Sequence, residues 1–242
     1  MRSATDFIRL CMYFLTHYKN FTLKLYDGYY TEFPVIVEGY LKRYRIKKGD
    51  TVIDAGAYLG AFALIASQLV GDKGTVIAFE PDEDNFKKLL NNIKLNKATN
   101  IIAINKGLWS KETILKFNNT NSGDSSFFFE YVKRDAIIDR PVVTLDGELK
   151  RLGIKRVDFV KMDIEGAEIE ALKGCDNLLK AAHGKFAIAS YHVVHGQKTC
   201  LELEKIFHSF GYKAETFLPE HSTTYAYKQK DPSFKGGRVW QK

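Results

Sequence analysis

From residue 51 onward, apolar and polar positions follow a regular alternation. Short runs rich in β-branched and aromatic side chains are typical of strands buried on both faces of a parallel sheet. Between these runs, apolar residues recur three and four positions apart, which is the period of a helix that buries one face. The alternation predicts an α/β fold with a seven-stranded, mostly parallel sheet and helices on both faces.

The strands predicted for this sheet span residues 51–54, 75–80, 100–105, 157–162, 185–191, 212–217 and 223–228. The helices predicted between them span residues 61–70, 82–96, 144–152, 165–173 and 197–210. A further short strand is predicted over 113–117, followed by a polar loop over 118–126. Because no helix separates the last two strands of the sheet, we expect the last strand to run antiparallel to the others.

The segment before this alternation has a different pattern. It predicts an amphipathic helix over 4–18, a hairpin with strands 21–25 and 29–33 joined at Asp27-Gly28, and a helix over 35–44. We therefore expect an N-terminal helical and hairpin extension over 1–48, a main domain over 49–230 and a loosely held tail over 231–242.

The composition is that of an ordinary globular protein. Of the 242 residues, 45% are hydrophobic and 27% are charged. The net charge of +7 permits an acidic partner such as nucleic acid, a phosphorylated substrate or a membrane surface. Because the basic residues are scattered rather than grouped, the charge alone does not favour any of these partners.

Three widely spaced cysteines, Cys11, Cys175 and Cys200, form no pair with metal-ligand spacing. Neither a disulfide framework nor a zinc site is indicated, and a reducing cytoplasm is the natural location. The apolar residues 7–15 are interrupted by charge and are too short to span a bilayer, so we expect no secretory signal and no transmembrane segment.

The first strand leads into a glycine turn. Asp54 ends the strand, Gly56 and Gly60 follow it, and a helix begins directly after Gly60. A strand, a glycine turn and a helix in this order are the opening of a nucleotide-binding unit, where glycines let the backbone approach a ligand closely. The next strand ends in Glu80, whose carboxylate can accept hydrogen bonds from both hydroxyls of a ribose.

Glycine spacing narrows the choice of nucleotide. Gly56 and Gly60 are four positions apart, and Tyr58 stands where a dinucleotide fingerprint would have its middle glycine, so NAD and FAD are disfavoured. The turn also lacks the Gly-Lys-Ser/Thr of a phosphate-binding loop. S-adenosylmethionine, which has a ribose and no phosphate, is the ligand that the pattern favours. The alternative is that the glycines serve only the packing of strand against helix.

A second stretch with chemical potential lies at the end of the fourth strand. We expect Asp163 to face the ligand there, with Lys161 on the same side of the strand and paired with Asp163 or a neighbouring carboxylate. Glu165 and Glu168 are three positions apart and are predicted to share one face of the first helical turn. The alternatives are that these glutamates stabilise the helix dipole and that Asp163 caps the helix.

Three motifs together resemble the FkbM family of S-adenosylmethionine-dependent methyltransferases. They are Asp54-Ala-Gly-Ala-Tyr-Leu-Gly60, Phe79-Glu80-Pro81 and Lys161-Met-Asp-Ile-Glu-Gly-Ala-Glu168, and the resemblance covers roughly residues 49–192. It implies the Rossmann-like fold of class I methyltransferases with S-adenosylmethionine as cofactor. It also implies, as the usual activity, O-methylation of a small molecule such as a sugar or a glycosylated metabolite.

The resemblance implies a set of cofactor-binding residues. Around the methionine end and the ribose these are Asp54, Gly56, Ala57, Tyr58, Gly60, Glu80 and Asp163. Around the adenine they are Pro81, Asp82, Gly107 and Leu108. The chain departs from the family at two positions, because Tyr58 stands where Asn is common and Ser190 where the fifth strand commonly has an acid two residues before His192.

Methyl transfer to a hydroxyl requires a base, because an alcohol keeps its proton at neutral pH. His192 and Asp163 are the candidates, His195 is a substitute for His192, and Lys161 completes the predicted catalytic set. No metal is expected. The predicted partner is a small-molecule acceptor, with its pocket formed by the loop 118–129, the N-terminal helix and the segment after His192, and a homo-oligomer is possible.

Three alternatives stay open. The net charge makes RNA a second possible acceptor, although no RNA-binding module is recognisable in the chain. Asp163, Glu165, Glu168 and His192 also contain the oxygen and nitrogen ligands of a metal-dependent hydrolase, but that reading leaves the glycine turn unexplained. The third alternative is a non-catalytic domain that keeps the fold.

Overall fold

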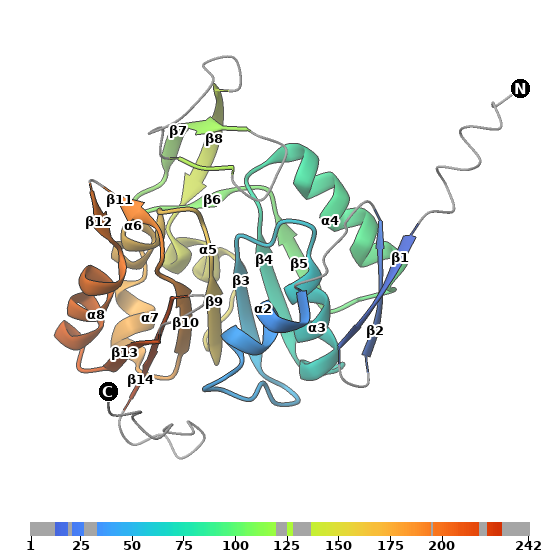
Figure 1. The fold of residues 1–242 in the computed structure, drawn as a ribbon, viewed down its shortest axis with the longest axis horizontal. Helices are drawn as coiled ribbons and strands as arrows, with labels where there is room; N and C mark the ends of the chain where they lie inside the picture. The colour runs from blue at the N-terminus through green and yellow to red at the C-terminus, as the bar shows by residue number, and fades with distance from the viewer. Residues whose placement is uncertain are drawn as a thin grey trace, which may run out of the picture.

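The computed structural model describes residues 13–18, 21–26, 33–119, 125–127, 137–194, 196–217 and 222–228. Its centre is a seven-stranded sheet with the strand order β13-β14-β10-β9-β3-β4-β5 (Figure 1). In chain order, the strands of this sheet are β3 (Thr51–Ala55), β4 (Thr75–Phe79), β5 (Ile101–Ile104), β9 (Phe159–Met162), β10 (Lys185–Ala189), β13 (Lys213–Phe217) and β14 (Thr223–Tyr227).

Strand direction agrees with the prediction. The pairs β3–β4, β3–β9, β4–β5 and β9–β10 are all parallel. The last strand, β14, is antiparallel to both β10 and β13, between which it lies. The predicted sheet, mostly parallel with an antiparallel last strand, is confirmed.

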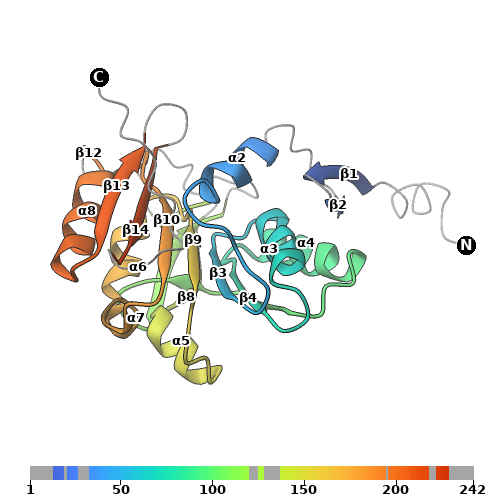
Figure 2. The same ribbon diagram turned by 90° about the horizontal axis from the view of Figure 1, so that it is seen from below.

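Helices cover both faces of the sheet, as predicted (Figure 2). On one face lie α2 (Phe33–Tyr40), α3 (Ala61–Val70) and α4 (Glu83–Leu95). On the other face lie α5 (Leu145–Arg151), α6 (Glu168–Lys173), α7 (Asp176–Ala181) and α8 (Cys200–Ser209). Alternate strand residues divide between the two cores: Val52 packs with the first group of helices and Ile53 with the second.

The predicted N-terminal helix is wrong where the structure describes it. Residues Tyr13–Tyr18 form a strand, β1, that pairs antiparallel with β2 (Phe21–Tyr26). The segment YFLTHY is rich in aromatic residues and threonine, which favour a strand. Of the predicted hairpin across Asp27-Gly28, the first strand is present as β2, which pairs with β1, and Phe33 belongs to a helix rather than to the second strand. Residues 4–12, 27–32 and the tail 231–242 lie outside the described residues.

The N-terminal strands pack directly on the main domain. Leu23 and Leu25 of β2 are fully buried in the core that contains α3 and α4. Asn96, just after α4, accepts a hydrogen bond from the backbone N–H of Lys24 at 3.0 Å and donates one to its carbonyl at 2.6 Å. The division of the chain at residue 48 stays a prediction.

Several elements were missed by the sequence patterns. A small sheet contains β6 (Gly107–Leu108), β8 (Ile137–Val143) and β7 (Thr113–Asn118), with β8 in the middle. Of these, β7 matches the short strand predicted over 113–117, whereas β6 and β8 were missed. β8 was missed because Asp139, Arg140 and Pro141 interrupt its apolar pattern, and proline is rare inside a sheet. The other missed elements are α7 and the short strands β11 (Val193–Val194) and β12 (Gln197–Lys198).

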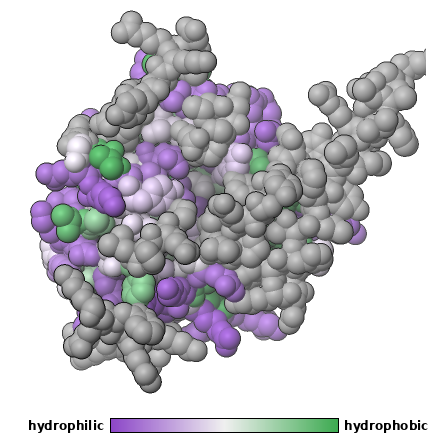
Figure 3. Space-filling model, viewed as in Figure 1, coloured by the Kyte–Doolittle hydropathy of each residue, from purple (hydrophilic) through white to green (hydrophobic). Residues whose placement is uncertain are grey.

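The surface seen in Figure 3 is mostly hydrophilic where it is described, with small, separate hydrophobic spots. The large apolar side chains that are exposed belong to different elements, namely Leu90, Ile114, Val193 and Leu201. None of the helices described here has both the length and the apolar character that crossing a bilayer requires.

Candidate functional site

A pocket opens beyond the carboxyl ends of β3, β4 and β9, where ligands bind in open α/β sheets. The open space within it is about 520 Å³, including solvent at its mouth. The predicted cofactor residues that line it are Gly56, Tyr58, Glu80, Pro81, Gly107, Leu108 and Asp163. The predicted residues Asp54, Ala57, Gly60 and Asp82 do not line it.

Apolar residues that were not among the predicted cofactor-binding residues complete the pocket wall. They are Phe79, Phe117, Phe127, Ile164 and Ala167. Phe127 crosses over the glycine of β6, because a Cβ on Gly107 would lie 2.6 Å from the Phe127 ring. Phe127 belongs to the loop 118–129, which the sequence predicts to form part of the acceptor pocket. Phe128 and Phe129 lie outside the described residues. Asn85, Lys106, Ser125 and Glu165 are the additional polar residues of the wall.

The two glycines of the turn have different roles. A Cβ on Gly56 (φ 75°) would lie 1.7 Å from the carbonyl oxygen of Asp163, so only glycine lets the β3 turn pass so close to the end of β9. A Cβ on Gly60 (φ 83°) would lie 2.3 Å from the Leu89 side chain of α4. Gly56 therefore shapes the pocket, whereas Gly60 serves packing, which is the alternative that the sequence left open.

Tyr58 has a backbone conformation that is unusual for its residue type. Its φ of 50° is in the left-handed region, which asparagine tolerates better than most residues. This conformation accompanies a hydrogen bond of 2.7 Å from the Tyr58 N–H to Oε2 of Glu80. The departure from the Asn that is common in the family therefore falls at a strained position on the pocket wall.

Glu80 is held by the backbone on both sides. Oε2 accepts the Tyr58 N–H, and Oε1 accepts the Asp82 N–H at 3.0 Å. Burial raises the pKa of Glu80 to about 7, although these two hydrogen bonds lower it. The Asp82 carboxylate caps α4 by accepting from the N–H groups of Asp84 and Asn85. Asp82 is therefore a helix cap behind the pocket rather than part of its wall.

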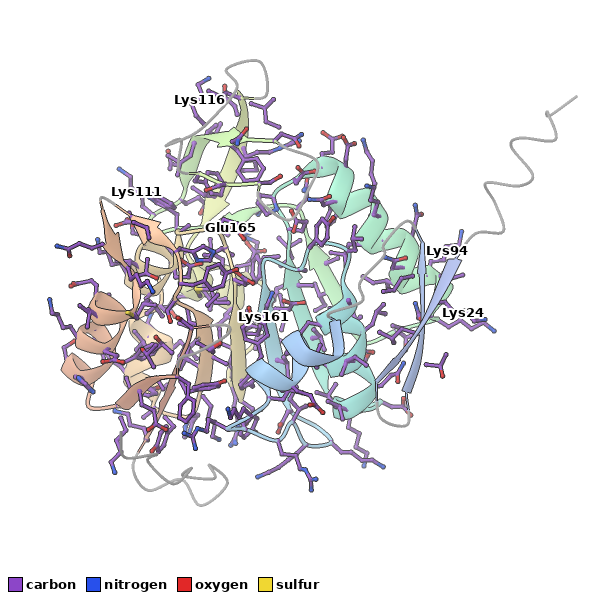
Figure 4. All side chains as sticks on the ribbon, viewed as in Figure 1. Lys24, Lys94, Lys111, Lys116, Lys161 and Glu165 are labelled. Atoms are coloured by element: carbon purple, nitrogen blue, oxygen red, sulfur yellow. The ribbon has the colours of Figure 1, made fainter. Side chains whose placement is uncertain are left out.

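Lys161 forms a buried ion pair with Asp54, which is one of the pairings that the sequence allowed. Its Nζ lies 3.0 Å from Oδ1 of Asp54 and donates to the Gly56 carbonyl at 2.7 Å. Figure 4 labels Lys161 on β9, with Glu165 beyond the carboxyl end of the same strand. Burial raises the pKa of the Asp54 carboxyl, and Lys161 opposes that shift. Through the hydrogen bond from Lys161 to the Gly56 carbonyl, the pair holds the glycine turn in place, and neither residue lines the pocket.

His192 lies among three carboxylates. Nδ1 is 3.1 Å from Oε1 of Glu168, and Nε2 is 3.3 Å from Oε2 of Glu165 and 3.7 Å from Oδ1 of Asp163. Burial lowers the pKa of His192, but the carboxylates outweigh it and raise that pKa to about 11. A ring that is protonated at neutral pH cannot accept a proton, so these surroundings do not support the base role expected for His192.

Glu165 and Glu168 converge on His192, but not as two positions of one helical turn. α6 begins only at Glu168, and Glu165 and Gly166 have φ angles of 54° and 97°, which are incompatible with the predicted helix start. The predicted shared helical face is therefore wrong, and an irregular turn brings the two side chains together. Burial raises the pKa of the Glu165 carboxyl, and His192 opposes that shift.

Asp163 accepts hydrogen bonds from two tyrosines. The Tyr40 hydroxyl donates to Oδ2 at 2.7 Å, and the Tyr191 hydroxyl donates to Oδ1 at 3.2 Å. Burial, followed by the charge of Asp163, raises the pKa of both hydroxyls, so both stay neutral donors. Tyr40 lies 123 positions from Asp163 in the chain, on α2, and no local pattern in the sequence identified it.

Ser190 lies outside this cluster. Its side chain is fully buried, where Oγ donates to the Ser222 carbonyl at 3.0 Å and accepts from the Thr224 hydroxyl at 2.9 Å. The serine that replaces the family's acid thus takes part in the contact between β10 and β14. His195, the substitute candidate for His192, lies outside the described residues.

A family model described as the methyltransferase FkbM domain matches residues 54–214, more than half of the chain. Hexuronic acid methyltransferase AglP of Haloferax volcanii is 29% identical over an alignment of 155 residues, and the match covers 60% of this chain and 57% of that protein. Methyltransferase sdnD of Sordaria araneosa is 30% identical over an alignment of 156 residues, and the match covers 52% of this chain and 60% of that protein. The chain thus spans less than two thirds of the length of these relatives.

Solved structures of methyltransferases share the fold. Methyltransferase FkbM of Methylobacillus flagellatus KT superposes with a TM-score of 0.53 at 22% identity, covering 80% of this chain and 51% of that one. Fibrillarin of Aeropyrum pernix, solved with natively bound S-adenosyl-L-methionine, superposes with a TM-score of 0.50 at 14% identity, covering 79% and 74%. The match of the family model to the segment that carries the glycine turn, Glu80 and Asp163 shows that the chain belongs to the FkbM family of S-adenosylmethionine-dependent methyltransferases.

Proposed function

We propose that the protein transfers a methyl group from S-adenosylmethionine to a hydroxyl of a small polar molecule such as a sugar. The observation that carries the proposal is the position of Asp163, whose carboxylate lines the pocket and belongs to the polar cluster with His192 and Glu165. The Asp163 carboxylate thus belongs both to the pocket at the strand ends and to a group of polar side chains. The hexuronic acid methyltransferase among the relatives supports a sugar-like acceptor.

The pocket residues fit the cofactor. Each oxygen of Glu80 accepts one backbone N–H and keeps a lone pair, so the carboxylate can accept the two hydroxyls of a ribose. Leu108 and Phe127 offer apolar surfaces for an adenine ring, and Gly107 lets Phe127 come close. When bound, S-adenosylmethionine supplies an electrophilic methyl group on a sulfonium.

We assign the proton-accepting role to Asp163. An acceptor hydroxyl beside the pocket would lose its proton to this carboxylate, which Tyr40 and Tyr191 hold in place. The carboxylates around His192 raise the pKa of its imidazole, which favours Asp163 over His192 for the role. Lys161 is occupied with Asp54 and supports the turn rather than the acceptor.

The charge of the wall favours a small acceptor over RNA. Three acidic residues, Glu80, Asp163 and Glu165, line the pocket, whereas Lys106 is the one basic residue among the described lining residues. Lys106 is itself 3.3 Å from Glu148. Carboxylates at the acceptor side would repel a phosphate backbone, whereas they can accept hydrogen bonds from the hydroxyls of a neutral polyol.

Two measurements test the proposal. Isothermal titration calorimetry of the full chain with S-adenosylmethionine should give saturable binding that Glu80→Gln weakens and that Glu83→Gln, a surface variant of the same region, leaves unchanged. Mass spectrometry of neutral sugars and uronates incubated with enzyme and labelled donor should find a product heavier by one methyl group. The absence of donor binding in the wild-type chain would refute the proposed function.

A further inference from the structure

We propose that Asp163, Glu165 and His192 bind a divalent cation that holds the acceptor beside the methyl donor. The inference rests on the proposed function for the role of the cation, but the site itself can be tested without any methyl transfer. Asp163 and Glu165 line the pocket, so the site would face the bound donor directly. Figure 4 labels Glu165 beyond the carboxyl end of β9, where the cluster lies.

The ligand atoms have the separations of a coordination sphere. One oxygen of Asp163, one of Glu165 and one nitrogen of His192 all lie within 4.8 Å of one another. Nε2 of His192 is 3.3 Å from Oε2 of Glu165 and 3.7 Å from Oδ1 of Asp163. Neighbouring ligands around an ion at about 2.0–2.2 Å are separated by roughly 3.0–3.6 Å in tetrahedral or octahedral geometry. The two distances from Nε2 are within or close to this range, and the two carboxylate oxygens, at most 4.8 Å apart, would draw together around a bound cation.

Glu168 provides a second, independent observation. It is fully buried, and its Oε1 accepts the N–H groups of Ile164 at 3.0 Å and Gly166 at 3.3 Å, which fix its position. The same oxygen lies 3.1 Å from Nδ1 of His192. In metal sites, a carboxylate on one ring nitrogen of a histidine directs the other nitrogen to the metal. Glu168 lies at the distance for this part, although its contact with Nδ1 is not an aligned hydrogen bond, and Nε2 is left for the cation.

The imidazole is buried without aligned partners. The His192 side chain is only 9% exposed, and within the described part of the chain neither ring nitrogen has a hydrogen bond of good geometry, although carboxylates surround both. A buried polar ring in this state is costly unless a ligand satisfies it. A cation between Nε2 and the two pocket carboxylates would provide that ligand.

The charges around His192 also favour a bound cation. Asp163, Glu165 and Glu168 place three carboxylates around one imidazole. The lysine that lies nearby in the fold, Lys161, is already paired with Asp54. A divalent ion among these side chains would compensate much of this negative charge. Two carboxylate oxygens and one imidazole nitrogen suit Mg²⁺, Mn²⁺ or Zn²⁺ and leave positions open for an acceptor.

The cation would define the acceptor class. An acceptor with two neighbouring oxygens, such as a vicinal diol of a sugar, can occupy two open positions at once. A hydroxyl bound to a divalent cation has a lowered pKa, so its proton passes to the free oxygen of a ligating carboxylate. The hydroxyl oxygen then forms a bond to the methyl carbon while the carbon–sulfur bond breaks, and the sulfur keeps the electron pair as a thioether.

The test is a metal titration of the full chain, freed of bound metal by a chelator and then desalted. Mn²⁺ binding is followed by electron paramagnetic resonance in the absence of donor and acceptor. We expect one saturable site per chain, at least tenfold weaker in Glu165→Gln, and unchanged in Glu202→Gln, an exposed glutamate of α8. Asp163→Asn serves as a second ligand variant, and thermal melting without metal identifies any variant that fails to fold.

Failure of the metal site and failure of the proposed function give different results. No saturable Mn²⁺ binding in the wild-type chain, or equal binding in wild type and both ligand variants, would overturn the cation site. If the cation binds as expected but no acceptor is methylated, the proposed function fails and the site stands. If the chelated protein methylates its acceptor at the full rate, the role of the cation in holding the acceptor is overturned and the proposed function stands.

Discussion

The two halves of the candidate site are built in different ways. On the donor side, backbone groups do most of the positioning: Gly56 passes over the end of β9, and the N–H groups of Tyr58 and Asp82 hold Glu80. On the acceptor side, side chains from distant segments meet, since Tyr40 comes from α2 while Tyr191 and His192 follow β10. A local motif can encode the first arrangement, but the second exists only once the chain has folded.

The largest effect is expected where the two halves touch. In Gly56→Ala, the added Cβ would lie 1.7 Å from the Asp163 carbonyl oxygen, so β3 and β9 must move apart. We expect a loss of unfolding free energy on the order of 3 kcal/mol or more, together with loss of donor binding. Urea unfolding and calorimetry measure the two effects.

Gly49→Ala is the matched control for this substitution. Gly49 has a similar φ of 86° but no atom within 4 Å of the added Cβ, so only the backbone strain of about 1–2 kcal/mol applies. A difference between the two variants isolates the collision with Asp163. Equal losses in both would show that the close approach of the two halves does not matter.

The next effect concerns the donor side alone. Glu80→Gln keeps the shape of the side chain but removes the negative charge that would accept the ribose hydroxyls. We expect donor binding to weaken by about 1.5–3 kcal/mol, the range for hydrogen bonds to charged groups. Calorimetry with S-adenosylmethionine measures this loss, and Mn²⁺ binding should be unchanged. A parallel loss of Mn²⁺ binding would show that the two halves are not separable.

Donor binding should also depend on pH through Glu80. The pKa of this carboxyl in the free protein is about 7, because burial raises it. If the bound donor requires the carboxylate, binding releases a proton from any molecule in which Glu80 is protonated. Affinity should therefore fall as the pH drops below 7, approaching about 1.4 kcal/mol per pH unit. Calorimetry at pH 6, 7 and 8 checks this slope, and Glu80→Gln should abolish it.

The donor side is also the part that the sequence predicted well. Spacing alone placed Gly56 and Glu80 at adjacent strand ends, and both line the pocket. The same rule also selected Gly60 and Asp82, which do not line the pocket, because a glycine that packs on Leu89 and an aspartate that caps α4 give the same local pattern as residues beside a ligand. The strand order and the antiparallel β14 followed from the alternation of elements, since few topologies satisfy it.

The acceptor side was predicted in composition but not in arrangement. Asp163, Glu165, Glu168 and His192 were all singled out, yet the left-handed Glu165 and the late start of α6 have no clear signal in the sequence. Tyr40 could not be found at all, because its partner lies 123 positions away and α2 showed only a helical pattern. β8 was hidden by Pro141 for a similar reason, since its pairing rather than its composition makes it a strand.

A smaller effect tests the acceptor side. Tyr40→Phe keeps the buried ring and removes the hydroxyl that donates to Oδ2 of Asp163 at 2.7 Å. We expect kcat/KM for the acceptor to fall by about 1–2 kcal/mol in transition-state free energy, with donor affinity unchanged. Steady-state kinetics and calorimetry measure both quantities. Tyr212→Phe, a buried tyrosine on the opposite face of the sheet, is the control and should leave both unchanged.

The smallest effect concerns Tyr58, a residue of the donor side whose backbone conformation is strained. Asparagine tolerates the φ of 50° better than tyrosine, so Tyr58→Asn should raise the unfolding free energy by about 0.5–1 kcal/mol. Because the hydrogen bond to Glu80 comes from the backbone N–H, this substitution should preserve it. If urea unfolding shows the gain in unfolding free energy while calorimetry shows weaker donor binding, the tyrosine ring contacts the ligand. The tyrosine would then strengthen donor binding at the cost of a strained backbone. If stability rises and donor binding is unchanged, the donor side depends on backbone groups here as well, and the contrast with the acceptor side becomes sharper.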